Sequence, residues 1–339
     1  MNENLLTITD DGLYCQIGDF YIDPWRPVDK AVITHGHADH ARWGSNWYLA
    51  SEESKYILEA RLGSEIHLQT IPYNETININ GISISLHPAG HILGSSQIRL
   101  EYRGEVWVVS GDYKSDSDKT CRSFEPLKCH TFITESTFGL PVYKWQSQQS
   151  IFNDINTWWE KNKDEKKTSL IFAYALGKAQ RILSGLDTGI GPIYTHGAVE
   201  KINQCYHKIG IQLPRTKYVG GVVNRNDFVG GMVIAPPSAD NPAWTKKFPY
   251  LWRAFACGWM QIRGNRRRRV VDRGFVLSDH SDWTGLLRAI EATGAENIWV
   301  SHGYSRVFVT YLRERGLNAC DVYTQFEGEM EDTEDLETQ

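Results

Sequence analysis

Short apolar runs separated by tight turns fill the first 140 residues of the chain. Residues 82–86 alternate apolar and polar side chains, as a half-buried strand does, whereas the continuous apolar run at residues 31–33 indicates a fully buried strand. The pair Asn80-Gly81 is a typical hairpin signal, and Arg103-Gly104 predicts a second turn. This pattern predicts the first half of a β-sandwich.

Beyond a polar stretch at residues 145–149, the pattern changes to helices that alternate with strands. Apolar residues recur at helical spacing or form short buried runs, and they predict this order: helix 151–163, strand 169–175, helix 178–186, strand 193–195 and helix 199–209. Such alternation is typical of a small parallel α/β unit.

The last part of the chain is expected to complete the first domain. The pattern predicts a strand at residues 274–277, a helix at 283–293, a strand that reaches His302, a helix at 306–315 and a strand at 319–323. Because 339 residues exceed what one hydrophobic core usually holds, we expect two domains. The first should comprise residues 1–144 and 271–326, the second residues 145–270, and residues 327–339 should form a tail.

Charge differs between this tail and the rest of the chain. The formal net charge is −5, but residues 327–339 contain seven acids and no Lys or Arg. The remaining residues carry 36 Lys and Arg against 34 Asp and Glu, a net charge of +2. We expect a mildly basic folded part and a disordered acidic tail, which either competes with nucleic acid or is a solvated segment without a function.

The composition predicts a cytoplasmic protein with no membrane contact. No run approaches twenty uninterrupted apolar residues, and the first residues lack the basic start and apolar block of a signal peptide. The six cysteines form no CxxC pair, so we expect them to be reduced thiols.

A cluster of imidazoles and one carboxylate follows the apolar run at residues 31–33. Within six positions the chain holds His35, His37, Asp39 and His40. The carboxyl ends of strands carry sites in α/β folds, and neutral imidazoles suit a borderline-soft dication such as zinc, so the spacing predicts a metal site. The carboxylate of Asp39 would help to bind a second ion. The alternative interpretation is a His-rich surface turn, or histidines whose hydrogen bonds are satisfied in the core.

Further candidate ligands follow other predicted strands. His91 comes after the strand at residues 82–86, Asp112 ends an apolar run, and His302 follows the apolar residues 298–300. Each of the three is adjacent to a glycine. One such position alone is weak evidence for a metal ligand. The repeated combination of a strand, a glycine and a ligand residue, however, predicts one shared metal site.

Three segments of the chain resemble the metallo-β-lactamase superfamily. They are HxHxDH at residues 35–40, Ala-Gly-His-x-x-Gly-Ser at residues 89–95 and Ser-Gly-Asp at residues 110–112. The resemblance is to members that keep two metals, and it implies a role for each ligand. His35, His37 and His91 would hold the first metal, Asp39, His40 and His302 the second, and Asp112 would bridge the two.

The segments around Glu135, His280 and His302 resemble motifs A, B and C of the β-CASP nucleases in that superfamily. Residues 21–28, 172–181 and 256–260 are similar to segments of the bacterial DNA ligase-associated exonucleases. The resemblance covers nearly the whole chain. It implies an α/β fold, the metallo-β-lactamase αββα sandwich with an inserted β-CASP α/β domain, and it implies a DNA ligase and a repair helicase as partners.

The candidate residues suit hydrolysis of a phosphodiester. Two divalent metal ions about 3.5 to 4 Å apart would activate a bridging hydroxide as nucleophile and stabilise charge that develops on phosphate. Asp39 and Asp112 are expected to hold these ions for catalysis. The His-rich donors favour zinc, and manganese is the alternative.

His280 and Glu135 are expected to be catalytic as well. Coordination does not require His280, which is therefore assigned to the scissile phosphate and to protonation of the leaving oxygen, while Glu135 orients it. The alternative is a Glu-His hydrogen bond that serves stability alone. Asp279 and Asp282 are interpreted as an N-cap and a first-turn acid of the helix at residues 283–293.

Basic residues supply candidates for substrate binding. Arginines are dense at Arg263, Arg266, Arg267, Arg268, Arg269 and Arg273, which favours phosphate contacts, although such a run is often a solvated loop. Lys178 and Arg181 begin a predicted helix and are expected to bind phosphate, with an ordinary helix surface as the alternative.

Aromatic residues and one further histidine near these segments have two interpretations each. Trp252, Phe255 and Trp259 either stack bases or pack in a core, and His196 either faces the substrate groove or is structural.

Together these features predict a metal-dependent phosphodiesterase that acts as an exonuclease on single-stranded or frayed DNA ends in repair. A β-CASP ribonuclease that processes RNA ends is the first alternative, because His302 at motif C is shared with the RNA-cleaving branch. A small-molecule metallo-hydrolase and a non-catalytic nucleic-acid clamp with structural metals are the others.

Overall fold

The computed structural model of the chain describes residues 4–264 and 271–322. The chain separates into two compact units: the first contains residues up to Lys144 and again from His280, and the second contains Trp145–Asp279. The acidic tail and Arg266, Arg267, Arg268 and Arg269 lie outside the described residues. Within the described part, no helix combines the length and apolar character needed to cross a bilayer.

In the first unit, the described residues form a six-stranded sheet whose strands follow chain order. Its strands are β1 (Thr7–Thr9), β2 (Gly12–Cys15), β3 (Phe20–Ile22), β4 (Lys30–Val32), β5 (Trp47–Ser51) and β6 (Leu68–Ile71). Strands β1 to β3 pair antiparallel and β3 to β6 pair in parallel. The carboxyl ends of β3 and β4 therefore lie side by side.

The other sheet of the first unit has seven strands among the described residues and mixes both kinds of pairing. Its order is β19 (Asn318–Asp321), β18 (Asn297–Ser301), β11 (Thr131–Glu135), β10 (Glu105–Val109), β9 (Ser96–Tyr102), β8 (Ile82–Pro88) and β7 (Thr76–Ile79). Strands β7 to β10 pair antiparallel, and β10, β11, β18 and β19 pair in parallel.

Both turns expected from the sequence connect adjacent antiparallel strands. Asn80 and Gly81 link β7 to β8 with φ angles of +50° and +93°, and Arg103 and Gly104 link β9 to β10 with +50° and +82°. Two successive residues with positive φ are what a two-residue type I′ hairpin requires.

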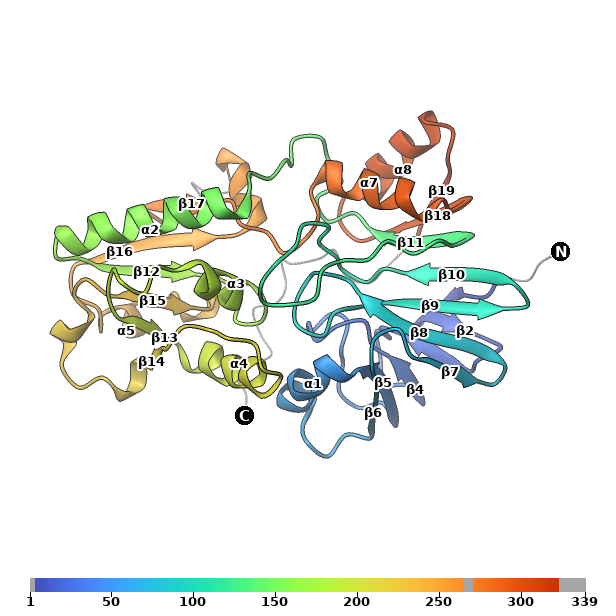
Figure 1. The fold of residues 1–339 in the computed structure, drawn as a ribbon, viewed down its shortest axis with the longest axis horizontal. Coiled ribbons are helices and arrows are strands. Elements are labelled where there is room, and N and C mark those ends of the chain that lie inside the picture. Colours follow the sequence, from blue (N-terminus) through green and yellow to red (C-terminus); the bar gives the residue numbers. More distant parts are fainter. Residues whose placement is uncertain (1–3, 265–270, 323–339) are drawn as a thin grey trace. The chain divides into compact units, whose positions relative to one another are not determined.

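The two sheets of the first unit face each other, and helices cover their outer faces (Figure 1). Val32 and Leu49 of one sheet share a buried cluster with Leu86 and Leu100 of the other. Helices α7 (Trp283–Thr293) and α8 (Ser305–Glu314) pack on the outside of the seven-stranded sheet. Helix α1 (Lys55–Leu62) packs on the six-stranded sheet through Leu58, so the unit has four layers.

The second unit is built on a six-stranded sheet, as far as the described residues show, in which every pairing is parallel. Its order is β14 (Lys217–Tyr218), β13 (Ile193–Thr195), β15 (Met232–Ala235), β12 (Thr168–Phe172), β16 (Leu251–Ala256) and β17 (Arg273–Phe275). Among the described residues, its helices are α2 (Gln148–Asp164), α3 (Lys178–Gly185), α4 (Gly197–Lys208) and the single turn α5 (Pro242–Thr245). Short 3₁₀ turns are η1 (Glu52–Ser54) in the first unit and, in the second, η2 (Val219–Gly221), η3 (Arg225–Phe228), η4 (Pro237–Ala239) and η5 (Gly258–Gln261).

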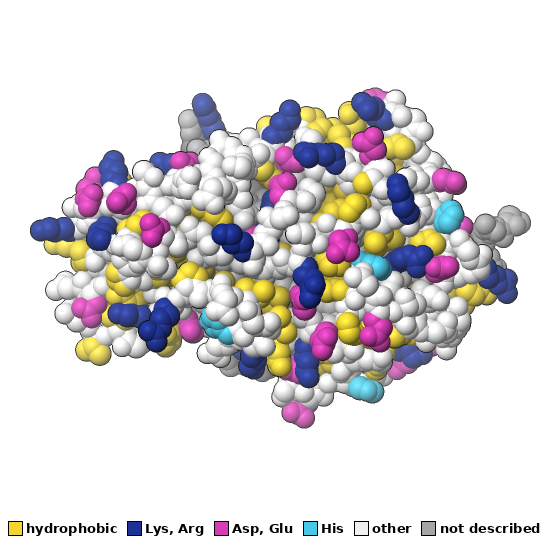
Figure 2. Space-filling model, in the orientation of Figure 1, with side chains coloured by type: hydrophobic (Ala, Val, Ile, Leu, Met, Phe, Trp, Pro, Cys, Tyr) yellow, Lys and Arg dark blue, Asp and Glu magenta, His cyan; other side chains and the backbone are white. Residues whose placement is uncertain are grey.

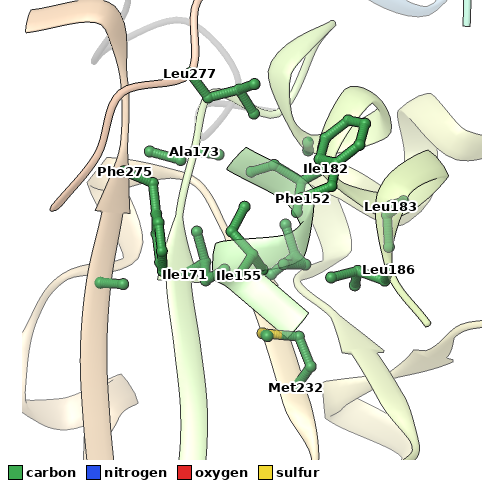
Figure 3. Packing of buried hydrophobic residues seen from close by; sticks show 14 of the residues in the cluster. Phe152, Ile155, Ile171, Ala173, Ile182, Leu183, Leu186, Met232, Phe275 and Leu277 are labelled. Carbon is green, nitrogen blue, oxygen red and sulfur yellow. The ribbon is translucent and has the colours of Figure 1, made fainter. Parts of the chain in front are cut away.

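Apolar clusters cover both faces of this parallel sheet. Phe152 and Ile155 of α2 and Ile182 of α3 pack against Ile171 of β12 (Figure 3). The second cluster includes Phe172 and aromatic residues of the loops that follow β14. A sheet that is buried on both faces explains why its strands appear in the sequence as continuous apolar runs.

The end of the second unit differs from the sequence-based boundary. The sequence assigns residues 271–279 to the first domain, whereas β17 pairs in parallel with β16 and these residues belong to the second unit. Phe275 and Leu277 are part of its core. A short apolar run does not specify which neighbour it pairs with, so tertiary packing decides this boundary.

Candidate metal centre

The His-rich segment forms the loop that follows β4, a strand in the middle of its sheet. The His37 carbonyl accepts hydrogen bonds from His40 N at 3.2 Å and from Ala41 N at 2.8 Å, which closes a tight turn. Arg61 of α1 donates to the Gly36 carbonyl, and Ser96 N donates to the Thr34 carbonyl at 2.8 Å. The backbone that carries the imidazoles is thus fixed by its own turn and by two other segments of the chain.

Four predicted ligands converge on one point. Potential ligand atoms of His35, His37, His91 and Asp112 all lie within 4.8 Å of one another. His37 Nδ1 is 3.2 Å from His35 Nε2 and 3.0 Å from His91 Nε2, and Asp112 Oδ2 is 3.6 Å from His35 Nε2. All four residues are buried. The loops after β4, β8 and β10 therefore supply one compact donor set.

Two glycines allow this convergence. Gly111, directly before Asp112, has a φ angle of +55°, and a Cβ there would lie 2.6 Å from the Thr34 Cβ. Gly90, directly before His91, has a φ angle of +75°, and a Cβ would lie 2.3 Å from a backbone oxygen. Both positions need the left-handed region and closer backbone approach than a side chain permits.

The remaining predicted ligands lie near Asp112 and near one another. His40 Nε2 is 3.5 Å from Asp112 Oδ2 and 3.6 Å from Asp39 Oδ2. The ring of His302 stacks on that of His40 with centroids 5.3 Å apart. A cavity of about 60 Å³ is lined in part by Asp39, His40 and His302. Asp112 thus faces both groups of donors.

Asp23 is a functional candidate to which sequence reasoning gave no role. Its Oδ2 lies 2.7 Å from His40 Nδ1, and its Oδ1 accepts a hydrogen bond from Thr34 N at 2.8 Å. Thr34 Oγ1 donates to Oδ2 as well. The sequence does contain one signal for Asp23, because it begins an Asp-Pro pair directly after a strand, β3. However, local sequence does not show that β3 pairs in parallel with β4, the strand that leads into the His-rich loop.

The electrostatics of the cluster differ between its histidines. Burial lowers the pKa of His35 well below its usual value, and the neighbouring His40 acts in the same direction. Burial alone would lower the pKa of His40, but the carboxylates of Asp39, Asp112 and Asp23 together raise it well above its usual value. Burial would raise the pKa of Asp112, yet nearby imidazoles, His40 first, hold it well below its usual value.

These residues fit divalent metal ions. His40 Nε2 is buried and makes no hydrogen bond in the described structure, while its Nδ1 is held by Asp23. A carboxylate on one ring nitrogen and an available second nitrogen is the usual arrangement of a metal-binding histidine. Imidazole nitrogens with carboxylate oxygens form a donor set that suits zinc or manganese.

Glu135 and His280 form the expected pair. His280 Nδ1 lies 3.0 Å and 2.9 Å from the two carboxylate oxygens of Glu135, which also accepts a hydrogen bond from Tyr113 N at 2.8 Å. Both side chains are buried, and the His280 ring centroid is 4.6 Å from that of His91. The pair therefore lies beside the first group of donors.

The two aspartates near His280 have different roles. Asp282 is the N-cap of α7, and its side chain accepts a hydrogen bond from Gly285 N at 2.7 Å. The interpretation of Asp279 as part of the helix start is wrong, because α7 begins at Trp283 and Asp279 pairs with Lys178 instead.

Lys178 and Arg181 do not lie on a helix surface. Both have 0% exposure. The Lys178 Nζ is 3.1 Å from Asp279 Oδ1, and Arg181 Nη1 donates to Gln148 Oε1 at 3.0 Å. The sequence predicts that the helix at residues 178–186 presents them to substrate, whereas α3 turns them toward polar partners within the second unit.

The other substrate-binding candidates are only partly described. Arg263 is exposed, whereas Arg266, Arg267, Arg268 and Arg269 lie outside the described residues. On the visible face, Lys and Arg side chains are interspersed with Asp and Glu (Figure 2).

The aromatic candidates and His196 all have contacts within the second unit. Phe255 and Trp259 pack in or against an apolar cluster, while Trp252 is 36% exposed with Lys167 Nζ 3.6 Å from its ring centroid. His196 caps α4 by accepting a hydrogen bond from Ala198 N at 3.1 Å. His196 therefore has a structural role here.

Comparison with known proteins finds relatives for most of the chain but no matching family model. The chain is 30% identical over 311 residues to a protein named probable DNA ligase from Opitutus terrae, a match that covers 91% of this chain and 30% of that protein. It is 31% identical over 141 residues to endoribonuclease YSH1 of Eremothecium gossypii, covering 40% of this chain and 18% of the relative.

A third relative is cleavage and polyadenylation specificity factor 73 of Drosophila melanogaster, with 27% identity over 165 residues that cover 47% of this chain and 24% of the relative. The chain spans less than a third of the length of each of the three. Among solved structures, a protein of unknown function from Enterococcus faecalis V583 matches with a TM-score of 0.59 and 10% identity, covering 80% of this chain and 74% of that one.

Proposed function

The chain belongs to the β-CASP branch of the metallo-β-lactamase superfamily, and from this membership we propose that it is a metal-dependent nuclease that acts on DNA ends. The observation that carries the proposal is the convergence of His35, His37, His91 and Asp112 with the pair Glu135 and His280 beside them. We also propose the family arrangement for the fold, a metallo-β-lactamase sandwich with a β-CASP insertion, and Trp145–Asp279 as the inserted domain.

The donors divide into two sets around Asp112. We assign His35, His37 and His91 to one divalent ion, Asp39, His40 and His302 to a second, and Asp112 to both. When bound, such ions activate water for attack and offset the negative charge that develops on phosphate. Asp23 keeps the His40 ring in place through its hydrogen bond to Nδ1.

His280 and Glu135 handle the proton of the leaving group. With Nδ1 held against Glu135, His280 presents Nε2 on the opposite side of its ring. We assign that atom to a hydrogen bond with the scissile phosphate and to donation of a proton to the leaving oxygen. The Glu135 carboxylate stabilises the imidazolium and fixes the ring orientation.

DNA as substrate is supported by the relative named probable DNA ligase, which matches 91% of this chain. We propose single-stranded or frayed ends as the substrate, exonucleolytic cleavage as the mode, a role in repair, and a DNA ligase and a repair helicase as partners. The basic residues from Arg263 to Arg269, with Arg273, are proposed to bind the phosphate backbone.

An RNA-processing nuclease is the second candidate. Two of the relatives are named endoribonuclease YSH1 and cleavage and polyadenylation specificity factor 73. His302 lies beside His40 in this structure, and the resemblance of its segment to motif C implies that it matches the RNA-cleaving branch. This observation makes RNA the necessary comparison substrate.

One series of digestions tests both candidates. Single-stranded DNA, duplex DNA and RNA oligonucleotides of matched sequence, each labelled at the 5′ or 3′ end, are incubated with zinc or with manganese. We expect successive shortening of single-stranded DNA from one end, and an Asp112→Ala variant should be inactive. Preferential RNA cleavage would favour the second candidate, and unchanged hydrolysis by the Asp112→Ala variant would refute the assigned site.

A further inference from the structure

A buried ion pair lies at the point where the chain leaves the second unit. Asp279 is the last residue of that unit before His280, and its Oδ1 is 3.1 Å from Lys178 Nζ, the first residue of α3. The side chains are 1% and 0% exposed. Lys178 Nζ also lies 4.6 Å from the Tyr174 ring centroid.

The location of this lysine is costly for stability. Burial penalises a charged ammonium group, and a cation at the N-terminus of a helix opposes the helix dipole. A buried ion pair often contributes no more to stability than apolar residues of the same size would. The pair is therefore better explained by the geometry that it imposes than by stability.

The residues that follow Asp279 are fixed one after another. His280 Nδ1 contacts both oxygens of Glu135, at 3.0 Å and 2.9 Å. Ser281 N donates to the Tyr113 carbonyl at 2.8 Å, and Ser281 Oγ accepts a hydrogen bond from Ser115 N at 2.9 Å. Asp279 precedes this series, and its side chain is paired with Lys178, while its carboxylate also lies within 4.8 Å of ligand atoms of His91 and His280.

We propose that Lys178 is a positioning residue for the nuclease reaction, acting through Asp279 to fix the backbone that presents His280 to the scissile phosphate. This rests on the proposed function, because it assumes that His280 contacts substrate. It replaces the direct phosphate contact expected for Lys178 from the sequence. Lys178 thus acts on the turnover rate and not on substrate affinity.

The test compares the wild type with a double variant in which the Lys178–Asp279 ion pair is replaced by two uncharged side chains. Lys178→Met combined with Asp279→Asn removes both charges while keeping side-chain shape, so no uncompensated charge remains buried. Lys178→Arg keeps the cation. Arg253→Met with Asp240→Asn is the matched control, because this pair lies in the same unit at 3.2 Å but is about 30% exposed, at 27% and 31%.

Three quantities are measured for each variant: kcat and KM on a labelled single-stranded oligonucleotide, the thermal midpoint, and hydrogen exchange of a peptide that spans residues 279–282. We expect the neutral pair to lower kcat about tenfold or more with KM unchanged, because small displacements of a catalytic group are costly. Exchange at residues 279–282 should rise, Lys178→Arg should retain most activity, and the control pair should match the wild type.

A folded neutral-pair variant with wild-type kcat, or one changed in KM alone, would overturn the proposal. Failure of that variant to fold would overturn it too, since the pair would then serve the stability of the second unit. If the wild type hydrolyses no oligonucleotide, the proposed function fails. Exchange at residues 279–282 then decides separately whether the pair holds this segment.

Discussion

At the scale of single residues, Asp23 supports the metal centre although it is assigned to no metal. It accepts hydrogen bonds from Thr34 N and Thr34 Oγ1 and contacts His40 Nδ1. One carboxylate therefore connects the backbone of the His-rich loop to the orientation of a ligand. Its own φ angle of +44°, which few non-glycine residues adopt, is tolerated in this hydrogen-bonded turn.

Replacement of Asp23 should weaken metal binding without removing a ligand. We expect Asp23→Ala to lower affinity for one of two divalent ions about 10- to 100-fold, because the His40 ring loses its orienting partner. Calorimetric titration of metal-depleted protein with zinc measures this. Asp19→Ala, at a carboxylate 59% exposed and paired with Lys30, is the control. Equal affinity in the Asp23 and Asp19 variants would contradict the role.

The site residues differ in how far the sequence could predict them. His35, His91 and Asp112 follow apolar runs and adjoin glycines, so local pattern and family resemblance together were enough to propose them. The Lys178–Asp279 ion pair joins residues 101 positions apart, and no local pattern encodes such a contact. The sequence therefore indicated the charges but not their burial.

At the scale of secondary-structure elements, α7 links the His280 segment to the seven-stranded sheet. Leu286 and Ile290 of this helix share a buried cluster with strand residues Val108 and Phe132. Its first turn is closed by Asp282, two residues after His280. The helix start is thus a local stabilising feature next to a proposed catalytic residue.

Loss of the Asp282 side chain should destabilise the protein, whereas an asparagine at this position should preserve the cap. We expect Asp282→Ala to lower the free energy of unfolding by about 1 kcal/mol, because Gly285 N loses its acceptor. Asp282→Asn should retain most of it, since asparagine caps equally well. The urea midpoint of each variant measures the effect. An equal loss in both variants would instead indicate a requirement for negative charge.

The hydrophobic pattern predicted the positions of helices and strands better than it predicted which strands pair with each other. The helix at residues 283–293 and the strand at residues 193–195 coincide with α7 and β13. The strand at residues 274–277 was also expected, but it was assigned to the wrong unit. Hydrophobic periodicity describes which face of an element is buried, whereas the pairing of β17 with β16 depends on residues distant in sequence.

At the scale of the whole molecule, the proposed metal ligands are distributed from His35 to His302. Between them, residues Trp145–Asp279 fold as a unit with its own sheet and core. The first unit is therefore discontinuous in sequence, and the donor set joins its two parts, because Asp112 faces His40 and His302 stacks on His40.

Removal of metal should consequently destabilise the protein. At free metal about a hundredfold above Kd, binding adds about 3 kcal/mol to folding, so chelation should lower the thermal midpoint and zinc or manganese should restore it. Differential scanning calorimetry with and without chelator measures this. Asp112→Ala serves as the control and should show a much smaller difference. If chelation does not change the thermal midpoint of the wild type, bound metal does not hold the two parts of the first unit together.

The position of His302 after β18 sets the order in which a newly made chain acquires its functional groups. A ribosome that has translated as far as β10 and the loop after it has already supplied His35, His37, His91 and Asp112, which are enough for one cation. Glu135 follows at the end of the next strand, β11, whereas His280 and finally His302 come only after the whole second unit. A polypeptide released before residue 280 therefore lacks groups assigned to cleavage, so incomplete synthesis yields no active nuclease inside the cell that makes it.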